Sequence, residues 1–332
     1  SIFQNDDYDV VIQNVATNES LVEYLKEYCN SRNSSTYIVS LSGGVDSMVI
    51  ATILRFLNKT TVCIHINYNN RLESRLEADF LKMWTFQNNI KLVCHEFTDI
   101  VRGTTNRKFY ENETKKVRFD IYKRVLEEYA DGSIILGHHD DDIIENVFNN
   151  VCRGRSILDL KVMQKESHVL GVPLSRPLLG MRKKYVYSFA YKYKVPYFKD
   201  TTPLWSLRGT YRSLYGPQLE KTYSGFSNNL MAIAEQSDQW NSLIQTHLIE
   251  PFVNSIKYTC NSAIIPLAGH MSSPECFWKT VLNKVFRKYG KPTPSNKSIK
   301  NLLSFMNTVC AVVLSKDTTA YMDNERLTIM FK

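Results

Sequence analysis

A hexapeptide near the N-terminus, Ser42–Ser47 (SGGVDS), could do the most specific chemistry in this 332-residue chain. It follows an apolar run, Tyr37–Leu41, that is typical of a buried strand, and Asp46 is placed to open a helix. Two adjacent glycines let a backbone pass close to an anion where a Cβ would clash. The free N–H groups at the start of a helix then favour negative charge. The hexapeptide therefore predicts a phosphate-binding turn, to which Ser42 and Ser47 can add hydroxyl donors.

The hexapeptide differs from the two commonest phosphate-binding loops. No lysine follows the glycines, as it would in a Walker A loop, and no third glycine completes a dinucleotide-binding fingerprint. The alternative is a strand–turn–helix corner in which the glycines serve packing alone. The whole hexapeptide, placed directly after an apolar strand, favours a nucleotide over that corner.

A second polar run, His138–Glu145 (HHDDDIIE), follows another apolar stretch, Ser133–Gly137. Asp141, Asp142 and Glu145 fall on one turn of a helix, because residues three and four apart share a face. So much negative charge at one point is costly unless it meets cations. Magnesium bound to a nucleotide and the ammonium group of an amine substrate are suitable cations. The alternative is a charged helix cap that faces solvent.

Two further clusters carry weaker signals. His65 and Asn67 alternate to one face at the end of a predicted strand, Thr60–Asn67, where an adenine or ribose edge could be read. Lys115 and Arg118 lie three residues apart in a predicted charged helix, so both could reach phosphates. Taken alone, that helix has the pattern of an ordinary solvated helix.

These clusters must be positioned by the elements around them. Strands and helices are predicted to alternate through the first half of the chain, which indicates βαβ units and a doubly wound, mostly parallel α/β sheet with helices on both faces. Ligands bind such sheets at the carboxyl ends of the strands, where the polar clusters fall. The predicted strands are 35–41, 60–67, 91–97 and 133–137, and the predicted helices are 21–29, 46–57, 71–87, 111–130, 141–151 and 181–194.

The second half has a different pattern. Residues 153–180 are predicted to be looser, and residues 199–217, with two prolines and two glycines, are predicted to form a long functional loop. Beyond them we expect helices over 223–250, 274–290 and 296–308, and two short strands over 309–314 and 327–330. The sequence therefore predicts a catalytic domain over residues 1–217 and a smaller, mainly helical domain over residues 218–332.

Composition bounds the partners and the compartment. The net charge is +8, and residues 176–212 hold nine basic residues against one acidic residue, which suits either a polyanion partner or a solvated basic face. Seven scattered cysteines without a CxxC pair predict buried free thiols in a reducing compartment, and neither zinc nor an iron–sulfur cluster. No apolar run is long enough for a membrane span, and the acidic first residues predict no signal or transit peptide. The expected location is the cytoplasm or an equivalent reducing compartment.

The motifs together resemble those of a known family. SGGxDS resembles the PP-loop of the N-type ATP pyrophosphatases, which split ATP between its α and β phosphates. Six other segments resemble motifs of the tRNA(Ile)-lysidine synthases, which modify the wobble cytidine of an isoleucine tRNA. The family motifs and the segments that resemble them are HxNHxLRxES at 65–74, EAxxRxxRY at 111–119, HHxDDxxET at 138–146, RGSGxxGLxxM at 153–163, RPLL at 176–179 and RNxxR at 208–212.

The resemblance implies an ATP-dependent tRNA modification. The chain would adenylate the C2 oxygen of the wobble cytidine of a tRNA(Ile) with a CAU anticodon and replace it with lysine, to give lysidine, AMP and pyrophosphate. ATP with Mg²⁺, tRNA and free L-lysine are the implied ligands, with no membrane partner, and a homodimer is left open.

The resemblance also implies roles for particular residues. The catalytic residues would be Asp46, Asp141, Asp142 and Glu145. The residues that bind ATP and pyrophosphate would be Ser42, Gly43, Gly44, Val45, Asp46, Ser47, His65, Asn67, Arg118 and His138. Lysine would be bound by Asp141 and Glu145, and the metal by Asp46 and Asp142. The tRNA would be bound by the mainly helical domain over residues 218–332 and by Arg176, Lys183, Lys184, Arg208, Tyr211 and Arg212.

Three other functions share parts of this pattern. A tRNA 2-thiolase of the PP-loop type would use the same ATP site, but such enzymes usually carry paired cysteines. A non-catalytic RNA-binding relative is the second alternative, because Tyr68, Asn146 and Gly209 stand where the lysidine synthases have His, Thr and Asn. An amidotransferase-type synthetase is the third, and it would need a glutaminase half that the sequence does not show.

Overall fold

The computed structural model describes residues 20–32, 34–70, 73–97, 106–129, 131–199, 206–305, 310–323 and 325–332. The N-terminal residues that predict no signal peptide, and residues 200–205 of the predicted loop, lie outside these ranges. The chain forms two compact units, one up to Glu235 and one from Gln236, and their boundary falls within helix α9 (Phe226–Ile244). The functional boundary between residues 217 and 218 stays a prediction.

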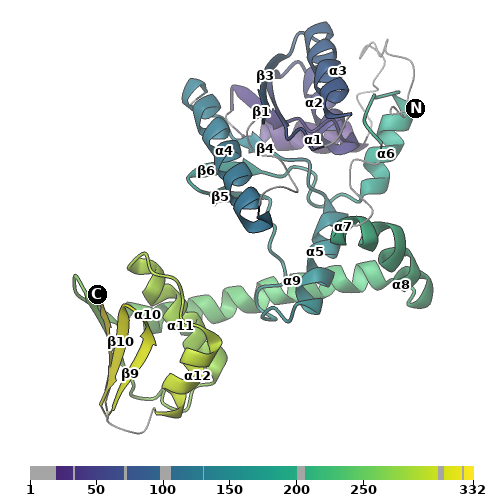
Figure 1. Ribbon diagram of the computed structural model, residues 1–332. Helices are drawn as coiled ribbons and strands as arrows, with labels where there is room; N and C mark the ends of the chain where they lie inside the picture. The colour runs from purple at the N-terminus through teal and green to yellow at the C-terminus, as the bar shows by residue number, and fades with distance from the viewer. Residues whose placement is uncertain are drawn as a thin grey trace. The chain divides into compact units, whose positions relative to one another are not determined.

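The first unit is built on a six-stranded sheet (Figure 1). The strand order is β3-β2-β1-β4-β6-β5, and every neighbouring pair is parallel except β5 with β6. The predicted mostly parallel sheet is therefore confirmed. The strands are β1 (Thr36–Ser40), β2 (Thr60–Asn67), β3 (Lys91–Glu96), β4 (Ile134–Ile135), β5 (Glu166–Val169) and β6 (Val172–Ser175).

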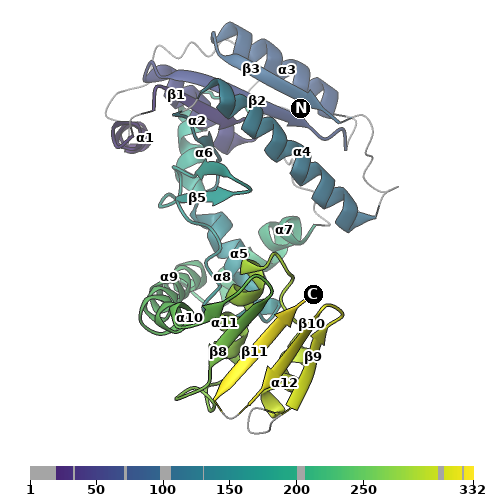
Figure 2. The same ribbon diagram turned by 90° about the vertical axis from the view of Figure 1, so that its left-hand side faces the viewer.

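Helices cover both faces of this sheet, as predicted (Figure 2). Tyr37 and Val39 of β1 lie in a core shared with four helices, whereas Ile38 lies in a second core shared with one. Both cores need apolar side chains, so a strand between them is a continuous apolar run. The four helices are α1 (Ser20–Asn30), α2 (Val45–Phe56), α3 (Ser74–Gln87) and α6 (Lys183–Lys192), and the one is α4 (Arg107–Glu128).

The two main polar clusters leave neighbouring strands at the same edge of the sheet. The chain leaves β1 through α2 toward β2, but it leaves β4 through α5 (Asp140–Cys152) toward β5 and β6 on the other side. Adjacent parallel strands whose connections run in opposite directions open a crevice at their carboxyl ends. The segments 42–47 and 138–145 therefore meet at one point.

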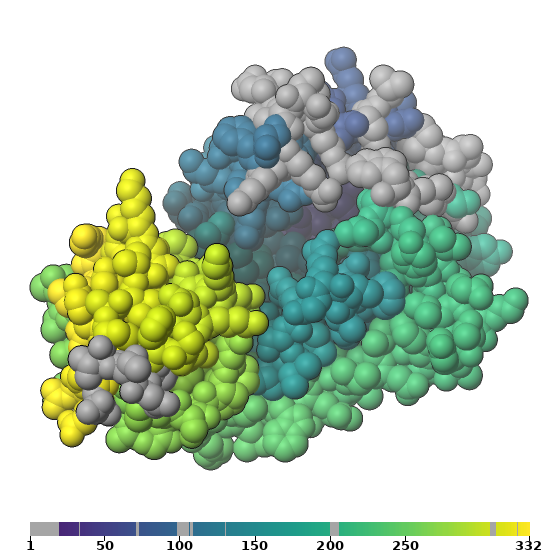
Figure 3. All heavy atoms as spheres, turned by 60° about the horizontal axis from the view of Figure 1, so that its bottom comes forward, coloured from purple at the N-terminus to yellow at the C-terminus, as the bar shows by residue number. Residues whose placement is uncertain are grey.

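The stretch 153–180 is more regular than predicted. It contains the hairpin of β5 and β6, whose two-residue turn, Leu170 and Gly171, has positive φ at both positions. This is the conformation of a tight hairpin turn, but leucine rarely adopts it, so the turn has no recognisable sequence signal. Residues 151–157, at the end of α5 and beyond it, are exposed (teal in Figure 3).

The prediction of a loop over residues 199–217 is wrong from residue 207 onward, where the chain is helical. Ser206 caps this helix, because its Oγ accepts from the Gly209 N–H at 3.0 Å. Pro217 lies in a first helical turn, where no N–H is needed. A Cβ on Gly216 would lie 3.1 Å from the Tyr211 carbonyl oxygen, so this glycine serves close packing rather than a turn. The elements are α7 (Leu207–Thr210), a π-helical turn η2 (Tyr211–Tyr215) and α8 (Gly216–Thr222).

The second unit contains a five-stranded antiparallel sheet in the order β7-β8-β11-β10-β9. The sequence predicts only β9 and β11, so the second unit holds more strand than expected. β8 and β10 are each five residues long, β8 ends in a proline and β10 begins with two threonines, so neither has a long apolar run. The strands are β7 (Lys257–Tyr258), β8 (Ser262–Pro266), β9 (Cys310–Ser315), β10 (Thr318–Met322) and β11 (Arg326–Phe331). The helical elements after α9 are η3 (Gln245–Ile249), α10 (Glu250–Asn254), α11 (Glu275–Lys288) and α12 (Asn296–Ser304).

All seven cysteines are free, as predicted, but their predicted burial is mostly wrong. Cys29 and Cys63 are buried and Cys310 is partly buried. Cys94, Cys152, Cys260 and Cys276 are exposed: Cys94 lies in the edge strand β3, Cys152 and Cys276 lie at helix ends, and Cys260 lies between β7 and β8. Within the described ranges, no helix is both long and apolar enough to cross a membrane.

Two tryptophans of the second unit make a matched test of its core. Trp278 on α11 is completely buried, whereas Trp240 on α9 is 60% exposed. Trp278→Ala should lower the free energy of unfolding by about 3–5 kcal/mol, because it removes a large buried side chain and leaves a cavity. Trp240→Ala should change it by less than about 0.5 kcal/mol. Chemical denaturation measures both values, and equal losses would contradict this core.

Candidate active site

The hexapeptide after β1 forms a tight turn whose shape requires glycine. Gly43 has a φ of +81°, in the left-handed region that favours glycine, and a Cβ there would lie 2.2 Å from the Phe198 ring. The Phe198 N–H donates to the Gly43 carbonyl oxygen at 2.9 Å. The aromatic ring therefore fixes one side of the turn and leaves the other side for a ligand.

The turn presents backbone donors at the start of α2. Gly44 is the N-cap residue, and no described side chain caps the N–H groups that follow it. Ser42 Oγ accepts from the Gly44 N–H at 3.2 Å, and Ser47 Oγ donates to the Gly44 carbonyl oxygen at 3.1 Å. The two serines thus brace the turn, while the first-turn N–H groups and the helix dipole form an anion site.

His65 and Asn67 lie buried at the end of β2, beside the start of the turn. The His65 Nδ1 atom lies 2.9 Å from the Leu41 carbonyl oxygen, which can only accept, so Nδ1 carries the proton and Nε2 is an acceptor. Burial lowers the pKa of His65, which keeps the ring neutral. Among the described residues, His65 Nε2 and Asn67 Nδ2 have no hydrogen-bond partner. One buried acceptor and one buried donor are therefore free for a ligand.

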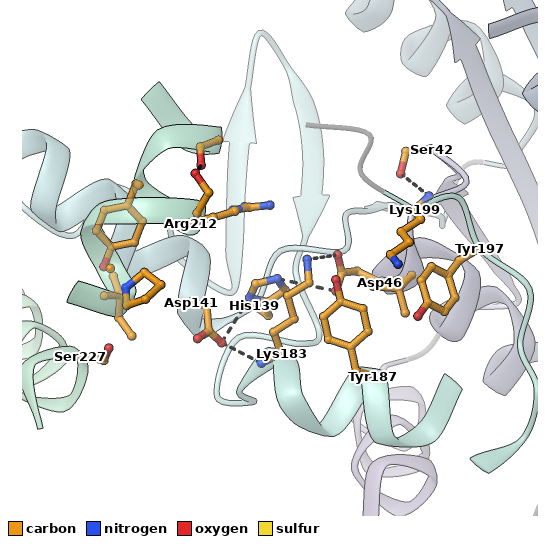
Figure 4. Close-up of a pocket in the computed structure, with 18 of the residues that line it drawn as sticks. Ser42, Asp46, His139, Asp141, Lys183, Tyr187, Tyr197, Lys199, Arg212 and Ser227 are labelled. Carbon is orange, nitrogen blue, oxygen red and sulfur yellow. Dashed lines mark hydrogen bonds and ion pairs between the residues drawn. The ribbon is translucent and has the colours of Figure 1, made fainter. Parts of the chain in front are cut away.

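The acidic run after β4 closes onto Asp46 of the turn. Gly137 makes this approach possible, because a Cβ there would lie 3.0 Å from Asp46 Cβ. His139 is buried among three carboxylates. Its Nε2 lies 3.6 Å from Asp46 Oδ1 and its Nδ1 lies 3.7 Å from Asp141 Oδ2 (Figure 4). The Nε2 atom also lies 3.4 Å from Asp142 Oδ2. The two polar clusters predicted from the sequence are thus one cluster in space.

The protein supplies its own cations to this cluster. Lys183 Nζ lies 3.4 Å from Asp46 Oδ2, and Arg182 Nη2 lies 3.2 Å from Asp141 Oδ1. Glu145, whose side chain is only 1% exposed, forms ion pairs of 2.9 Å with two arginines, and one of them also reaches Asp142 at 2.8 Å. These arginines are Arg208 and Arg212. Four carboxylates therefore face four cationic side chains, which offsets the repulsion expected from the sequence.

The environment shifts several pKa values in this cluster. Burial acts to raise the pKa of Asp142, but His139 and Arg212 outweigh it, so the pKa is lowered and Asp142 stays ionised. Burial and the charge of Glu145 raise the pKa of Tyr211 to about 12, so its hydroxyl stays protonated. Burial lowers the pKa of His138 to about 4, and Arg176 adds to that shift.

A cavity of about 870 Å³ opens between the turn, the acidic run and the helices α6 to α8. Eight of the predicted site residues line it, and their positions support the predicted grouping: Ser42, Gly44, Val45, Asp46, Asp141, Lys183, Tyr211 and Arg212. Lining residues that the sequence analysis did not select include His139, Tyr187, Tyr197, Phe198 and Lys199. His139 had a signal, since it stands between a strand and the acidic run, whereas the aromatic residues had none.

Other predicted residues lie away from this lining. Arg176 is buried and donates to the Gln164 carbonyl oxygen and to Ser167 Oγ, both at 2.9 Å, so it holds the hairpin rather than facing a ligand. Arg118 lies beside Tyr68, whose pKa is raised by burial and lowered in part by that arginine. Lys184 is exposed on α6.

The carboxylates suit a partly hydrated metal better than a closed metal cage. Within the described residues, no group of three or more His, Cys, Asp or Glu side chains is arranged to hold a metal ion. Asp46 Oδ1, however, is buried and receives no hydrogen bond from any described residue. Mg²⁺ commonly uses one or two carboxylates and completes its shell with phosphates and water, so Asp46 fits that ion. Asp142 would join it only in exchange for a contact, because its Oδ1 accepts from Arg212 and its Oδ2 from the His139 N–H.

The sequence matches a known family over this unit. Residues 17–205, more than half of the chain, match the PP-loop domain family, and the chain belongs to it.

Curated relatives narrow the similarity further. The chain is 25% identical to the tRNA(Ile)-lysidine synthase of Chlamydia abortus over 258 residues, which cover 77% of this chain and 80% of that protein. It is 28% identical to the tRNA(Ile)-lysidine synthase of Streptococcus sanguinis over 217 residues, 64% of this chain and 48% of that protein. The predicted resemblance is thereby confirmed. Among solved structures, the U34-tRNA thiolase NcsA of Methanococcus maripaludis is 18% identical, with a TM-score of 0.49 over 68% of this chain and 80% of that one.

The pKa of His138 predicts a loss of stability in acid. The folded pKa of about 4 lies below the usual value of 6.5, so the unfolded chain takes up the proton first as the pH falls. Between pH 7.5 and pH 5 this should cost about 2 kcal/mol of unfolding free energy. His138→Gln should lose less stability over that interval than the unmodified protein does.

His168→Gln, a change on the exposed side of β5, is the control, and denaturation at both pH values measures the difference. If His138→Gln and the unmodified protein lose equal stability, His138 is not held neutral in the fold.

Proposed function

We propose that this protein is a lysidine-forming tRNA ligase. It would join AMP to the C2 oxygen of the wobble cytidine of tRNA(Ile) with a CAU anticodon and then replace that oxygen with lysine. The observation that carries the proposal is the meeting of the Ser42–Ser47 turn with the acidic run 138–145 in one cavity. The similarity to tRNA(Ile)-lysidine synthases over most of the chain supports it.

The turn would hold the phosphates of ATP. Its first-turn N–H groups would bind the β and γ phosphates, which leave together as pyrophosphate. Asp46 and Asp142 would hold Mg²⁺, which supplies positive charge to the phosphates as they separate. The free acceptor of His65 and the free donor of Asn67 complement the amino group and ring nitrogen of adenine.

Apart from one proton transfer, two bonds would form and two would break in the reaction. First, the cytidine C2 oxygen attacks the α-phosphorus, and the bond to the β phosphate breaks. Then the ε-amino nitrogen of lysine attacks C2, the C2–O bond breaks, and AMP leaves with that oxygen. A proton from the lysine nitrogen passes to a carboxylate of the site.

The structure favours one of the two predicted lysine-binding carboxylates. Asp141 lines the cavity and its side chain is 38% exposed, so it can meet an ammonium group and accept its proton. Glu145 is 1% exposed and paired with two arginines. We therefore assign direct lysine contact to Asp141. Glu145 would instead hold Arg208 and Arg212 in position by its two ion pairs.

The tRNA would be bound mainly through phosphates. Lys184 is exposed and the Arg208 side chain is 51% exposed, so both can meet a phosphate from the solvent side. Arg176 is left out of this assignment because it is buried. The boundary at residue 217 and tRNA binding by residues 218–332 stay part of the proposal.

The proposed reaction predicts a specific product. Incubation with ATP, labelled L-lysine and tRNA(Ile) with a CAU anticodon should place the label in the wobble nucleoside, as seen after nuclease digestion. The same tRNA with a different wobble base is the control and should remain unlabelled. ATP cleavage without lysine transfer would indicate that a compound other than lysine is the second reactant, for example a sulfur donor. If no tRNA leads to release of pyrophosphate, both the lysidine-forming reaction and the 2-thiolation reaction are refuted.

Substitution of Asp46 should affect catalysis but not tRNA binding. Asp46→Asn keeps the shape of the side chain but removes the charge, so it should lower AMP transfer by about 10²-fold or more. Binding of tRNA, measured by filter retention, should stay unchanged. Asp79→Asn, an exposed change on α3, is the matched control and should alter neither. Loss of tRNA binding in Asp46→Asn would contradict the assigned role.

A further inference from the structure

We propose that Lys183 contacts the β and γ phosphates of ATP and supplies the positive charge that the phosphate-binding turn does not carry itself. The inference rests on the proposed use of ATP and gives Lys183 a role different from the tRNA binding predicted from the sequence. The turn runs from Ser42 to Ser47 without a lysine or arginine, and the next basic residue, Arg55, lies in the last turn of α2. A Walker A loop has its own lysine at this point. A cation for the phosphates must therefore come from another element.

The start of α6 is fixed against the start of α5, which aims Lys183 at the turn. The Lys183 N–H donates to Asp141 Oδ2 at 2.7 Å, and the Gly180 N–H donates to Asp140 Oδ1 at 2.7 Å. The Asp140 N–H in turn donates to the Met181 carbonyl oxygen at 3.0 Å. These three bonds join residues far apart in the sequence, so the backbone of Lys183 has little freedom.

The side chain of Lys183 runs into the cavity toward the turn (Figure 4). Its Nζ lies 3.4 Å from Asp46 Oδ2, and the side chain is only 22% exposed. Ser42, Gly44 and Asp46 line the same cavity. An ammonium group on a flexible stem can turn from the Asp46 carboxylate to a phosphate without backbone movement. Lys183 therefore neutralises Asp46 in the free protein. When ATP binds, Mg²⁺ would take over at Asp46 and the Lys183 amine would turn to the phosphates.

The other cations that line the cavity are less suited to this task. Arg212 is committed to two carboxylates, Asp142 and Glu145. Lys199 also lines the cavity and its side chain lies beside the turn (Figure 4), but it is exposed and, among the described residues, no ion pair holds its amine at Asp46. Lys183 is the lining lysine that is directed at the turn by its backbone bonds and by its contact with Asp46.

Equilibrium binding to the full-length protein tests this role. We would measure the affinities of ATP, AMP and inorganic pyrophosphate by calorimetry for the unmodified chain, Lys183→Met and Lys192→Met. Lys192 is an exposed lysine at the other end of α6, so it is a matched control. Lys183→Met should weaken ATP and pyrophosphate about ten- to a hundred-fold, because a charge-assisted hydrogen bond is lost, and should leave AMP nearly unchanged. Lys183→Arg should restore part of the ATP affinity.

A repeat without metal separates a direct contact from a positioning role. In EDTA, Lys183→Met should still weaken pyrophosphate binding if Lys183 touches the phosphates. If it only orients Asp46 toward Mg²⁺, the effect should vanish without metal, and that result would overturn the inference. An equal loss of AMP and ATP affinity would overturn it as well, as would ATP binding by Lys183→Met at the unmodified level.

An unmodified protein that binds ATP but transfers no lysine would refute the proposed reaction and leave the role of Lys183 standing. One that binds neither ATP nor pyrophosphate would refute both.

Discussion

The site depends on one electrostatic constraint: the carboxylates at the ends of two neighbouring strands must be neutralised. Asp46 follows β1, while Asp141, Asp142 and Glu145 follow β4, and all four surround one buried region. Left alone, these charges would repel one another and raise their own pKa values. Lysine and arginine side chains from the α6 and α7–η2 segments meet them instead, and the pKa of Asp142 is lowered. The same pairing fixes these segments as walls of the cavity.

This constraint links the fold to the proposed chemistry. Parallel strands with connections in opposite directions bring the phosphate-binding turn and the acidic run together. Glycines at positions 43 and 137 allow the close approach of Phe198 and of Asp46. A nucleotide with its metal would enter a site in which cations and carboxylates are already paired, so each ligand charge would replace a protein charge rather than add to it. Such exchange gives a polar site without unpaired buried charge.

The first unit shows which features a sequence reveals. β1 to β3 and the helices between them are predicted within a few residues, because buried strands leave apolar runs and amphipathic helices leave an apolar pattern of period 3.6. The hairpin of β5 and β6 is missed, since Leu170 gives no sign of a turn. The helix from residue 207 is missed for the opposite reason: Gly209, Gly216 and Pro217 are typical turn residues, but a cap, a close contact and a first-turn position accommodate them here.

In the candidate site, too, some features can be predicted from the sequence and others cannot. The Ser42–Ser47 turn and the acidic run can be recognised in the sequence because the residues that act together are neighbours along the chain. The sequence cannot tell which basic residues fold back onto those carboxylates, so Lys183 and Arg212 stand in the predicted tRNA surface although they lie in the cavity. Tertiary contacts, rather than local pattern, decide between a solvated and an engaged lysine.

The fate of the cytidine oxygen tests the central claim most directly. A tRNA(Ile) carrying ¹⁸O at C2 of its wobble cytidine would be incubated with the protein, ATP and lysine, and the released AMP would be analysed by mass spectrometry. The proposed reaction transfers that oxygen to the phosphate of AMP, so one ¹⁸O atom should appear in AMP for each lysine incorporated. Unlabelled AMP, or ADP and phosphate in place of AMP and pyrophosphate, would contradict the account.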